Sequence, residues 1–217
     1  MKNLIVQIFI NKKGWEEEHR LDAQSDEVLR LSHILVKHYA KINNIEYKLI
    51  TEPKINFKHP TWERFQLFDS HWTEEYEHVL YLDTDVFTWP KSPNIFKYFS
   101  NDSFNVVTNY YNKQFNNRPM FNAGVFALNK VSRDIMQKYI SKKIWMDNYK
   151  KDPLWEDSKE LNLLTQVSNV KLNWLDHRWN RKNKPNAYFS HLYGNLKKTN
   201  PNLPSIVLAR EIVKKLI

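Results

Sequence analysis

Two aspartates stand one residue apart at the end of an apolar run, in the segment VLYLDTDVF at residues 79–87. Buried ionised carboxylates are costly without a cation, so Asp83 and Asp85 indicate a metal site, a catalytic pair or a solvated strand end. Alternate side chains of a strand share a face, which would bring both carboxylates to one side of the strand's carboxyl end. Open α/β sheets bind ligands at that edge. Two oxygen ligands there suit a divalent cation such as Mg²⁺ or Mn²⁺.

Glycine supplies a second signal, because the chain contains only 3 glycines, at positions 14, 124 and 194. Gly124 lies inside the strand-like segment FNAGVFALN, where glycine weakens a strand unless a ligand or another backbone approaches closely. Gly194 follows a predicted strand and stands three residues from both His191 and Lys197. Imidazole binds metals, and an ammonium group binds phosphate. Either segment alone reads as ordinary structure, but together with the aspartates they favour a ligand site.

The segments that must position these side chains alternate between strands and helices. The hydrophobic pattern predicts strands at 4–10, 46–50, 78–83, 104–108, 120–129 and 187–192. It predicts helices at 25–43 (with Ser25 as N-cap), 61–72, 132–144, 158–167 and 205–217. This order indicates an α/β fold with a single mixed, mostly parallel sheet flanked by helices, in one domain over residues 1–217.

Composition narrows the class of protein. Hydrophobic residues make up 41% of the 217 residues, which is enough for a sizeable core. The net charge of +9 would suit a nucleic-acid, lipid or phosphorylated partner, but the basic residues are scattered along the chain. Without cysteine, the chain has no disulfide and no Cys-x-x-Cys redox site. The apolar run at 4–10 is too short for a signal peptide and no run has the length of a membrane span, so we expect a cytoplasmic protein.

Four segments occur in an order typical of one enzyme family: YLDTDVF at 81–87, FNAGVFALN at 121–129, EDSKELNLL at 156–164 and HLYGNLK at 191–197. In this combination the chain resembles glycosyltransferases of the GT-A fold, a Rossmann-like nucleotide-diphospho-sugar transferase fold. It looks most like the glycogenin and lipopolysaccharide galactosyltransferase family (glycosyltransferase family 8). The resemblance implies a metal-dependent transferase that moves a hexose from a nucleotide sugar, with UDP-hexose as the expected donor, to a glycan, protein or lipid acceptor.

The resemblance also implies a role for each matching residue. Mn²⁺ or Mg²⁺ would bridge the donor diphosphate and would be held by Asp83, Asp85 and His191. The donor would be bound by Arg64, Thr84, Asn122, Gly124, Gly194 and Lys197, the last two at the diphosphate. Asp157 would be the catalytic residue, on the reacting face of the sugar, in a transferase that acts with retention. A diphosphate leaving group gains negative charge as the sugar bond breaks, and a cation and a lysine stabilise that charge.

Two positions depart from the family pattern. Ser158 stands where the family has glutamine after the helix-opening aspartate, and the end of the first strand lacks the family's usual nucleotide-pocket signature. Asp157 also has a purely structural interpretation, because Glu156 and Asp157 form an acidic first turn that complements a helix dipole.

Two other functions fit parts of the sequence. A phosphatase of the haloacid dehalogenase type would use Asp83 as nucleophile and Asp85 as acid, but such enzymes carry that motif on their first strand. A nucleic-acid-binding protein would use the net charge, and HRWNRKNK at 177–184 is the only basic and aromatic segment that fits it. The basic amphipathic helix at 205–217 is expected to pack on the domain, with weak attachment to an anionic membrane surface as the alternative.

Overall fold

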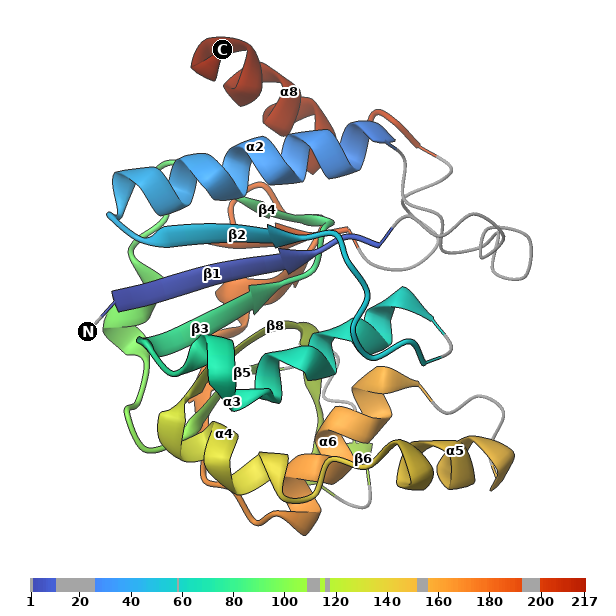
Figure 1. The fold of residues 1–217 in the computed structure, drawn as a ribbon. Helices are drawn as coiled ribbons and strands as arrows, with labels where there is room; N and C mark the ends of the chain where they lie inside the picture. The colour runs from blue at the N-terminus through green and yellow to red at the C-terminus, as the bar shows by residue number, and fades with distance from the viewer. Residues whose placement is uncertain are drawn as a thin grey trace.

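The computed structural model describes residues 2–10, 26–57, 59–108, 114–115, 118–151, 156–192 and 200–217. At its centre lies a six-stranded sheet in the order β2-β1-β3-β8-β5-β9 (Figure 1). Its strands are β1 (Lys2–Ile8), β2 (Glu46–Ile50), β3 (Tyr76–Leu82), β5 (Phe104–Thr108), β8 (Phe121–Asn129) and β9 (Leu172–Leu175). β8 runs antiparallel to both of its neighbours, and the other pairs are parallel. The predicted mixed, mostly parallel sheet is confirmed.

Helices cover both faces of this sheet, so its central strands are buried on both sides and their sequences are continuous apolar runs. In β1, Leu4 and Val6 pack on one side and Ile5 packs on the other. The first side is covered by η1 (Pro60–Phe68), α4 (Lys130–Gln137), α5 (Lys142–Lys151) and α6 (Asp157–Val167) (Figure 1). The second side is covered by α2 (Asp26–Ile42), whose predicted N-cap Ser25 lies outside the described residues.

β8 departs from regular alternation in its first half. Ala123 packs on one side of the sheet and Val125 on the other, although residues two apart in a regular strand share a face. The register between β8 and β5 shifts within the same segment. An irregularity of this kind, a β-bulge, bends a strand and redirects its side chains. It lies at Gly124, one of the positions that the sequence singled out.

Two predicted helices are divided in the structure. The segment 61–72 forms the 3₁₀ helix η1 and then the short helix α3 (Ser70–Thr73). Asp69 is extended between them, and its carboxylate accepts a hydrogen bond from the N–H of His71, which caps α3. The segment 132–144 likewise divides between α4 and α5. Apolar residues continue across both breaks, so the hydrophobic pattern does not reveal them.

A second, three-stranded sheet has the order β10-β11-β4, so the prediction of a single sheet was wrong on this point: the strand predicted at 187–192 pairs outside the large sheet. It joins β4 (Val86–Thr88), which follows β3 after a short turn, to β10 (Arg181–Lys182) and β11 (Phe189–His191). β11 is antiparallel to β4, with His191 opposite Val86. The remaining short elements are η2 (Ile95–Tyr98), β6 (Gln114–Phe115), β7 (Arg118–Pro119) and η3 (His177–Asn180). The small sheet thus carries a late part of the chain to the end of β3.

The C-terminal helix α8 (Pro204–Leu216) packs on the outer side of α2 (Figure 1). Its residues Ile206, Ala209 and Val213 are buried in one cluster with residues of α2. Arg210 donates two hydrogen bonds of 2.7 Å to the carboxylate of Glu27 in α2. The prediction that this helix docks on the domain is confirmed. None of the helices in the described part of the chain is long and apolar enough to cross a membrane.

Candidate active site

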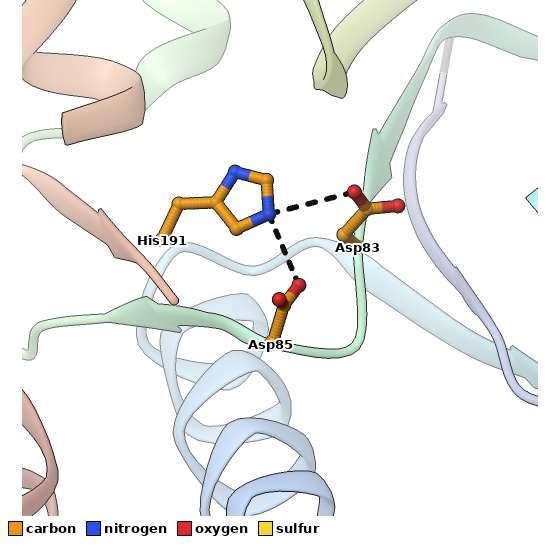
Figure 2. Close-up of side chains that lie close together, drawn as sticks. All are labelled: Asp83, Asp85 and His191. Atoms are coloured by element: carbon orange, nitrogen blue, oxygen red, sulfur yellow. Dashed lines mark ion pairs between the residues drawn. The ribbon is translucent and has the colours of Figure 1, made fainter. Parts of the chain in front are cut away.

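The two aspartates lie in the turn between β3 and β4, because β3 ends at Leu82 and β4 begins at Val86. Strand alternation predicted that the two side chains share one face. They do converge, but the turn, and not the strand, brings them together (Figure 2). The N–H of Val86 donates to the carbonyl of Asp83 at 3.0 Å and closes the turn. Thr84, between the aspartates, is half-buried.

His191 reaches the same point from β11 (Figure 2). Its Nε2 lies 3.0 Å from Oδ1 of Asp85 and 3.5 Å from Oδ2 of Asp83. One ligand atom from each of the three residues lies within 4.8 Å of the other two, the only such group of metal-ligating side chains in the described part of the chain. Asp85 and His191 are 2% and 1% exposed, so the site is recessed rather than spread along an exposed edge.

The electrostatics of this cluster favour positive charge between the carboxylates. Burial alone would lower the pKa of His191, but Asp85 and Asp83 raise it to about 9. Burial likewise opposes the charge of Asp83, yet Arg64, His191 and Tyr81 hold the pKa of that carboxyl well below its usual range. The Asp83 carboxylate therefore stays ionised and favours a cation at the point where the three side chains meet.

Gly124 forms the wall of the cluster. A Cβ atom at this position would stand 2.2 Å from Cε1 of His191, 2.6 Å from Oδ2 of Asp83 and 2.9 Å from Oδ1 of Asn122. Any side chain would therefore displace the ligands themselves. Glycine in this strand was predicted to mark a close approach, and here the approaching atoms belong to the candidate ligands.

Arg64 joins the aspartate turn to the start of α6. Its guanidinium is 3% exposed and lies 3.0 Å from Oδ1 of Asp83 and 2.9 Å from Oδ2 of Asp157. Nη1 also donates to the carbonyl of Ala123 at 2.6 Å. Burial disfavours the charged guanidinium, but Asp157 and the other acidic groups raise the pKa of Arg64 above its usual value. Arg64 is thus a buried cation that orders both carboxylates.

Asp157 lies at a helix start and beside Arg64, and its catalytic role remains a prediction. It is the first residue of α6, after the N-cap Glu156, so its charge lies at the positive end of the helix. It is also buried, and its partner is Arg64 rather than solvent. The acidic first turn therefore connects to the aspartate turn through a single guanidinium.

Sequence reasoning missed two polar contacts in the site. Tyr81 in β3 donates its hydroxyl to Oδ1 of Asp83 at 2.7 Å, although its place in an apolar run is typical of a core aromatic. Asn180 in η3 hydrogen-bonds Nδ1 of His191 at 2.8 Å, and no pattern in the sequence singles it out. Gly194 and Lys197, predicted at the diphosphate, lie outside the described residues.

The donor set fits a divalent cation. Two carboxylates and one imidazole converge. This mixture of oxygen and nitrogen ligands suits a transition ion such as Mn²⁺, whereas Mg²⁺ prefers oxygen ligands alone. The missing side chain at Gly124 leaves the ligand atoms room to meet. Asp83, Asp85 and His191 would hold the ion.

The fold has counterparts among solved structures. Comparison with protein-family models and with curated proteins gave no match. Comparison with solved structures gave glycosyltransferases. The chain has 17% identity and a TM-score of 0.59 to the glycosyltransferase involved in glycosylation of the major capsid of PBCV-1, over 99% of this chain and 100% of that one.

Two further structures agree with this result. The galactosyltransferase LgtC, solved with donor and acceptor sugar analogs, has 15% identity and a TM-score of 0.57, over 97% of this chain and 94% of LgtC. The glycosyltransferase GlyE of Streptococcus pneumoniae TIGR4 has 12% identity and a TM-score of 0.59, over 100% of this chain but 64% of GlyE. The chain has the GT-A glycosyltransferase fold, and the resemblance predicted from its motifs is confirmed at the level of the fold.

Proposed function

We propose that this protein is a metal-dependent glycosyltransferase that moves a hexose from UDP-hexose to a glycan, protein or lipid acceptor, with retention. The observation that carries the proposal is the convergence of Asp83, Asp85 and His191 on one point beside Gly124. The GT-A fold supports it, and so does the complex of LgtC with donor and acceptor sugar analogs. The comparisons support neither a phosphatase nor a nucleic-acid-binding protein.

The proposed catalysis depends on neutralising the negative charge of the leaving diphosphate. When bound, a divalent cation would neutralise the diphosphate that departs as the sugar bond breaks. Asp83, Asp85 and His191 would hold that cation, and Arg64 would keep Asp83 ionised and oriented toward it. Lys197 and Gly194 would contact the diphosphate, as the resemblance implies. Thr84, Asn122 and Gly124 would line the donor pocket on the same basis.

Asp157 bears on the stereochemistry. In a retaining transferase the acceptor approaches on the leaving-group face, where a departing phosphate oxygen can take its proton, so no separate general base is required. We expect Asp157→Asn to lower turnover far more than donor binding. We also expect the parent to convert an α-linked donor into an α-linked product by NMR. A β-linked product would overturn retention and leave the donor class standing.

Thermal-shift titration tests the proposal as a whole. UDP with Mn²⁺ should raise the melting temperature by roughly 5–10 °C at about one hundred times the dissociation constant, from ligand linkage in a chain of this size. Mn²⁺ should support binding better than Mg²⁺, because imidazole prefers transition ions. Titrations with GDP, UDP-sugars and GDP-sugars complete the series. The nucleotide sugar that raises the melting temperature most identifies the donor.

Variants connect that shift to the site. Asp85→Asn and His191→Ala should abolish the Mn²⁺-dependent shift, whereas His177→Ala, at a partly exposed histidine of η3, should keep it. The comparison uses the shift and not the melting temperature itself, because Asp85 and His191 are buried and their loss also lowers stability. A parent that no nucleotide stabilises would refute the proposed function.

A further inference from the structure

A row of two amide side chains leads away from the imidazole of His191. Asn180 lies next to the ring, and its Oδ1 is 2.8 Å from Nδ1 of His191. Its Nδ2 donates to Oδ1 of Asn122 at 3.1 Å. The same oxygen of Asn122 accepts from the N–H of Gly124 at 2.8 Å. Asn180 and His191 are 4% and 1% exposed, so the bond between them forms in the interior, and the two bonds to Asn122 are partly buried.

The backbone fixes the direction of every bond in this row. The N–H of Gly124 can only donate, so it faces the oxygen of Asn122 and not its nitrogen. That oxygen in turn requires a donor from Asn180, which must present Nδ2 to Asn122 and therefore Oδ1 to His191. An amide oxygen only accepts, so Nδ1 of His191 must carry a hydrogen. Nε2, on the carboxylate side of the ring, is then the nitrogen that a cation can bind when it displaces the proton shared with the carboxylates.

We infer that Asn180, supported by Asn122, is a positioning residue that holds His191 as a metal ligand through Nε2. This inference rests on the proposed function, because it supposes that the cluster binds a divalent cation. A histidine ligand that donates its second N–H to a fixed acceptor has its ring orientation and its metal-binding nitrogen set before the metal arrives. Gly124 then serves twice, since it leaves room for the ligands and begins the row that orients one of them.

The resemblance placed Asn122 at the donor sugar. In this structure its Oδ1 accepts two hydrogen bonds from within the protein. We therefore assign that oxygen to the support of His191, in addition to the place in the donor pocket that the resemblance implies for this residue.

Metal affinity in the absence of nucleotide tests the inference. Asn180→Leu keeps a similar volume but offers no acceptor, and it should weaken Mn²⁺ binding by about 10- to 100-fold in calorimetry or EPR titration. Asn180→Asp keeps an oxygen opposite Nδ1 and should restore most of that affinity. Asn105→Leu is the matched control, because Asn105 is an equally buried amide in β5 with its own hydrogen bonds to Ser100 and Ser103. It should lose stability without a change in Mn²⁺ affinity.

A spectroscopic measurement on the parent keeps the inference testable if Asn180→Leu does not fold. With diamagnetic Zn²⁺ bound, ¹⁵N NMR of His191 should show a protonated Nδ1 and a metal-bound Nε2. Metal on Nδ1, or Asn180→Leu with the affinity of the parent, would overturn the inference while nucleotide binding and the proposed function stand. A parent that binds neither Mn²⁺ nor Zn²⁺ would overturn both.

Discussion

A methyl group added at Gly124 would meet His191 at 2.2 Å and Asp83 at 2.6 Å. Separations this short do not occur between packed atoms, and the imidazole lies in a close-packed interior with little space to retreat. At the scale of the residue, then, the geometry of the ligands depends on one position that contributes no side chain.

We expect Gly124→Ala to lose metal-dependent nucleotide binding and to destabilise the fold. Replacing glycine with alanine at a compatible site stabilises a protein by about 0.4–1 kcal/mol, whereas overpacking costs about 1–3 kcal/mol, so the collision should dominate. Denaturant unfolding and a Mn²⁺–UDP titration measure the two effects. Unchanged binding by this variant would show that the ring has room to move.

The cause of the destabilisation expected for Gly124→Ala can be isolated with His191→Ala, which removes the atom closest to the added methyl group. If the imidazole is the obstacle, Gly124→Ala should cost less stability in the His191→Ala background than in the parent. Residues in direct contact show coupling energies of about 0.5–3 kcal/mol in such cycles. Strict additivity would assign the cost to Asp83 or Asn122 instead.

Residue types and motif order were enough to predict Asp83, Asp85, His191 and Gly124 as one site. They could not predict the contacts of Tyr81 and Asn180, because those depend on how η3 and β3 pack and not on local spacing. The burial of His191 was also beyond the sequence, since it depends on the pairing of β11 between β10 and β4.

At the scale of the element, the docking of α8 on α2 combines apolar burial with one ion pair. The pair joins Arg210 to both carboxylate oxygens of Glu27, a bidentate geometry that is stronger than a single contact. The side chains of Glu27 and Arg210 are 39% and 30% exposed, so solvent screens them. Most of the docking energy should come from the buried apolar face.

We expect Glu27→Gln to lower stability at pH 7 by a few tenths to about 1 kcal/mol, the range of partly exposed ion pairs. The hydrogen bond from Arg210 holds the pKa of Glu27 below its ordinary value of 4.5. A lowered carboxyl pKa contributes stability that is present above pH 4.5 and is lost as the pH falls through the lowered value. Urea unfolding from pH 7 down to pH 3 should show the two proteins converge.

Glu211→Gln provides the control for this pair. Glu211 binds Lys214 within α8 and connects no two elements, so its loss should leave the docking intact. A Glu27→Gln protein that matches the parent at every pH would show that the contact between α2 and α8 is apolar alone.

The elements illustrate why local patterns predict some structure and miss the rest. β2, β5 and α6 match their predicted segments closely, because hydrophobic periodicity is a local property. The bulge in β8 depends on its pairing with β5, and the break at Asp69 depends on a side-chain cap, which hydrophobic periodicity does not register. Of these irregular features, the bulge is the one that shapes the site.

At the scale of the whole molecule, periodicity predicted the class of fold but not the order of the strands. Whether β8 inserts antiparallel between β3 and β5 is decided by tertiary packing, which hydrophobic periodicity does not report. That residues 1–217 form one domain remains a prediction.

The candidate ligands also separate widely along the chain, since the aspartates follow β3 and the histidine ends β11. During synthesis, both carboxylates leave the ribosome about one hundred residues before the imidazole, and a loop of that length must close before the three groups meet. The loop includes β5, β8 and β9, so its closure waits for the far half of the large sheet. A nascent or truncated chain would lack the third ligand. Tight cation binding would therefore identify the molecules in which β11 has joined the small sheet.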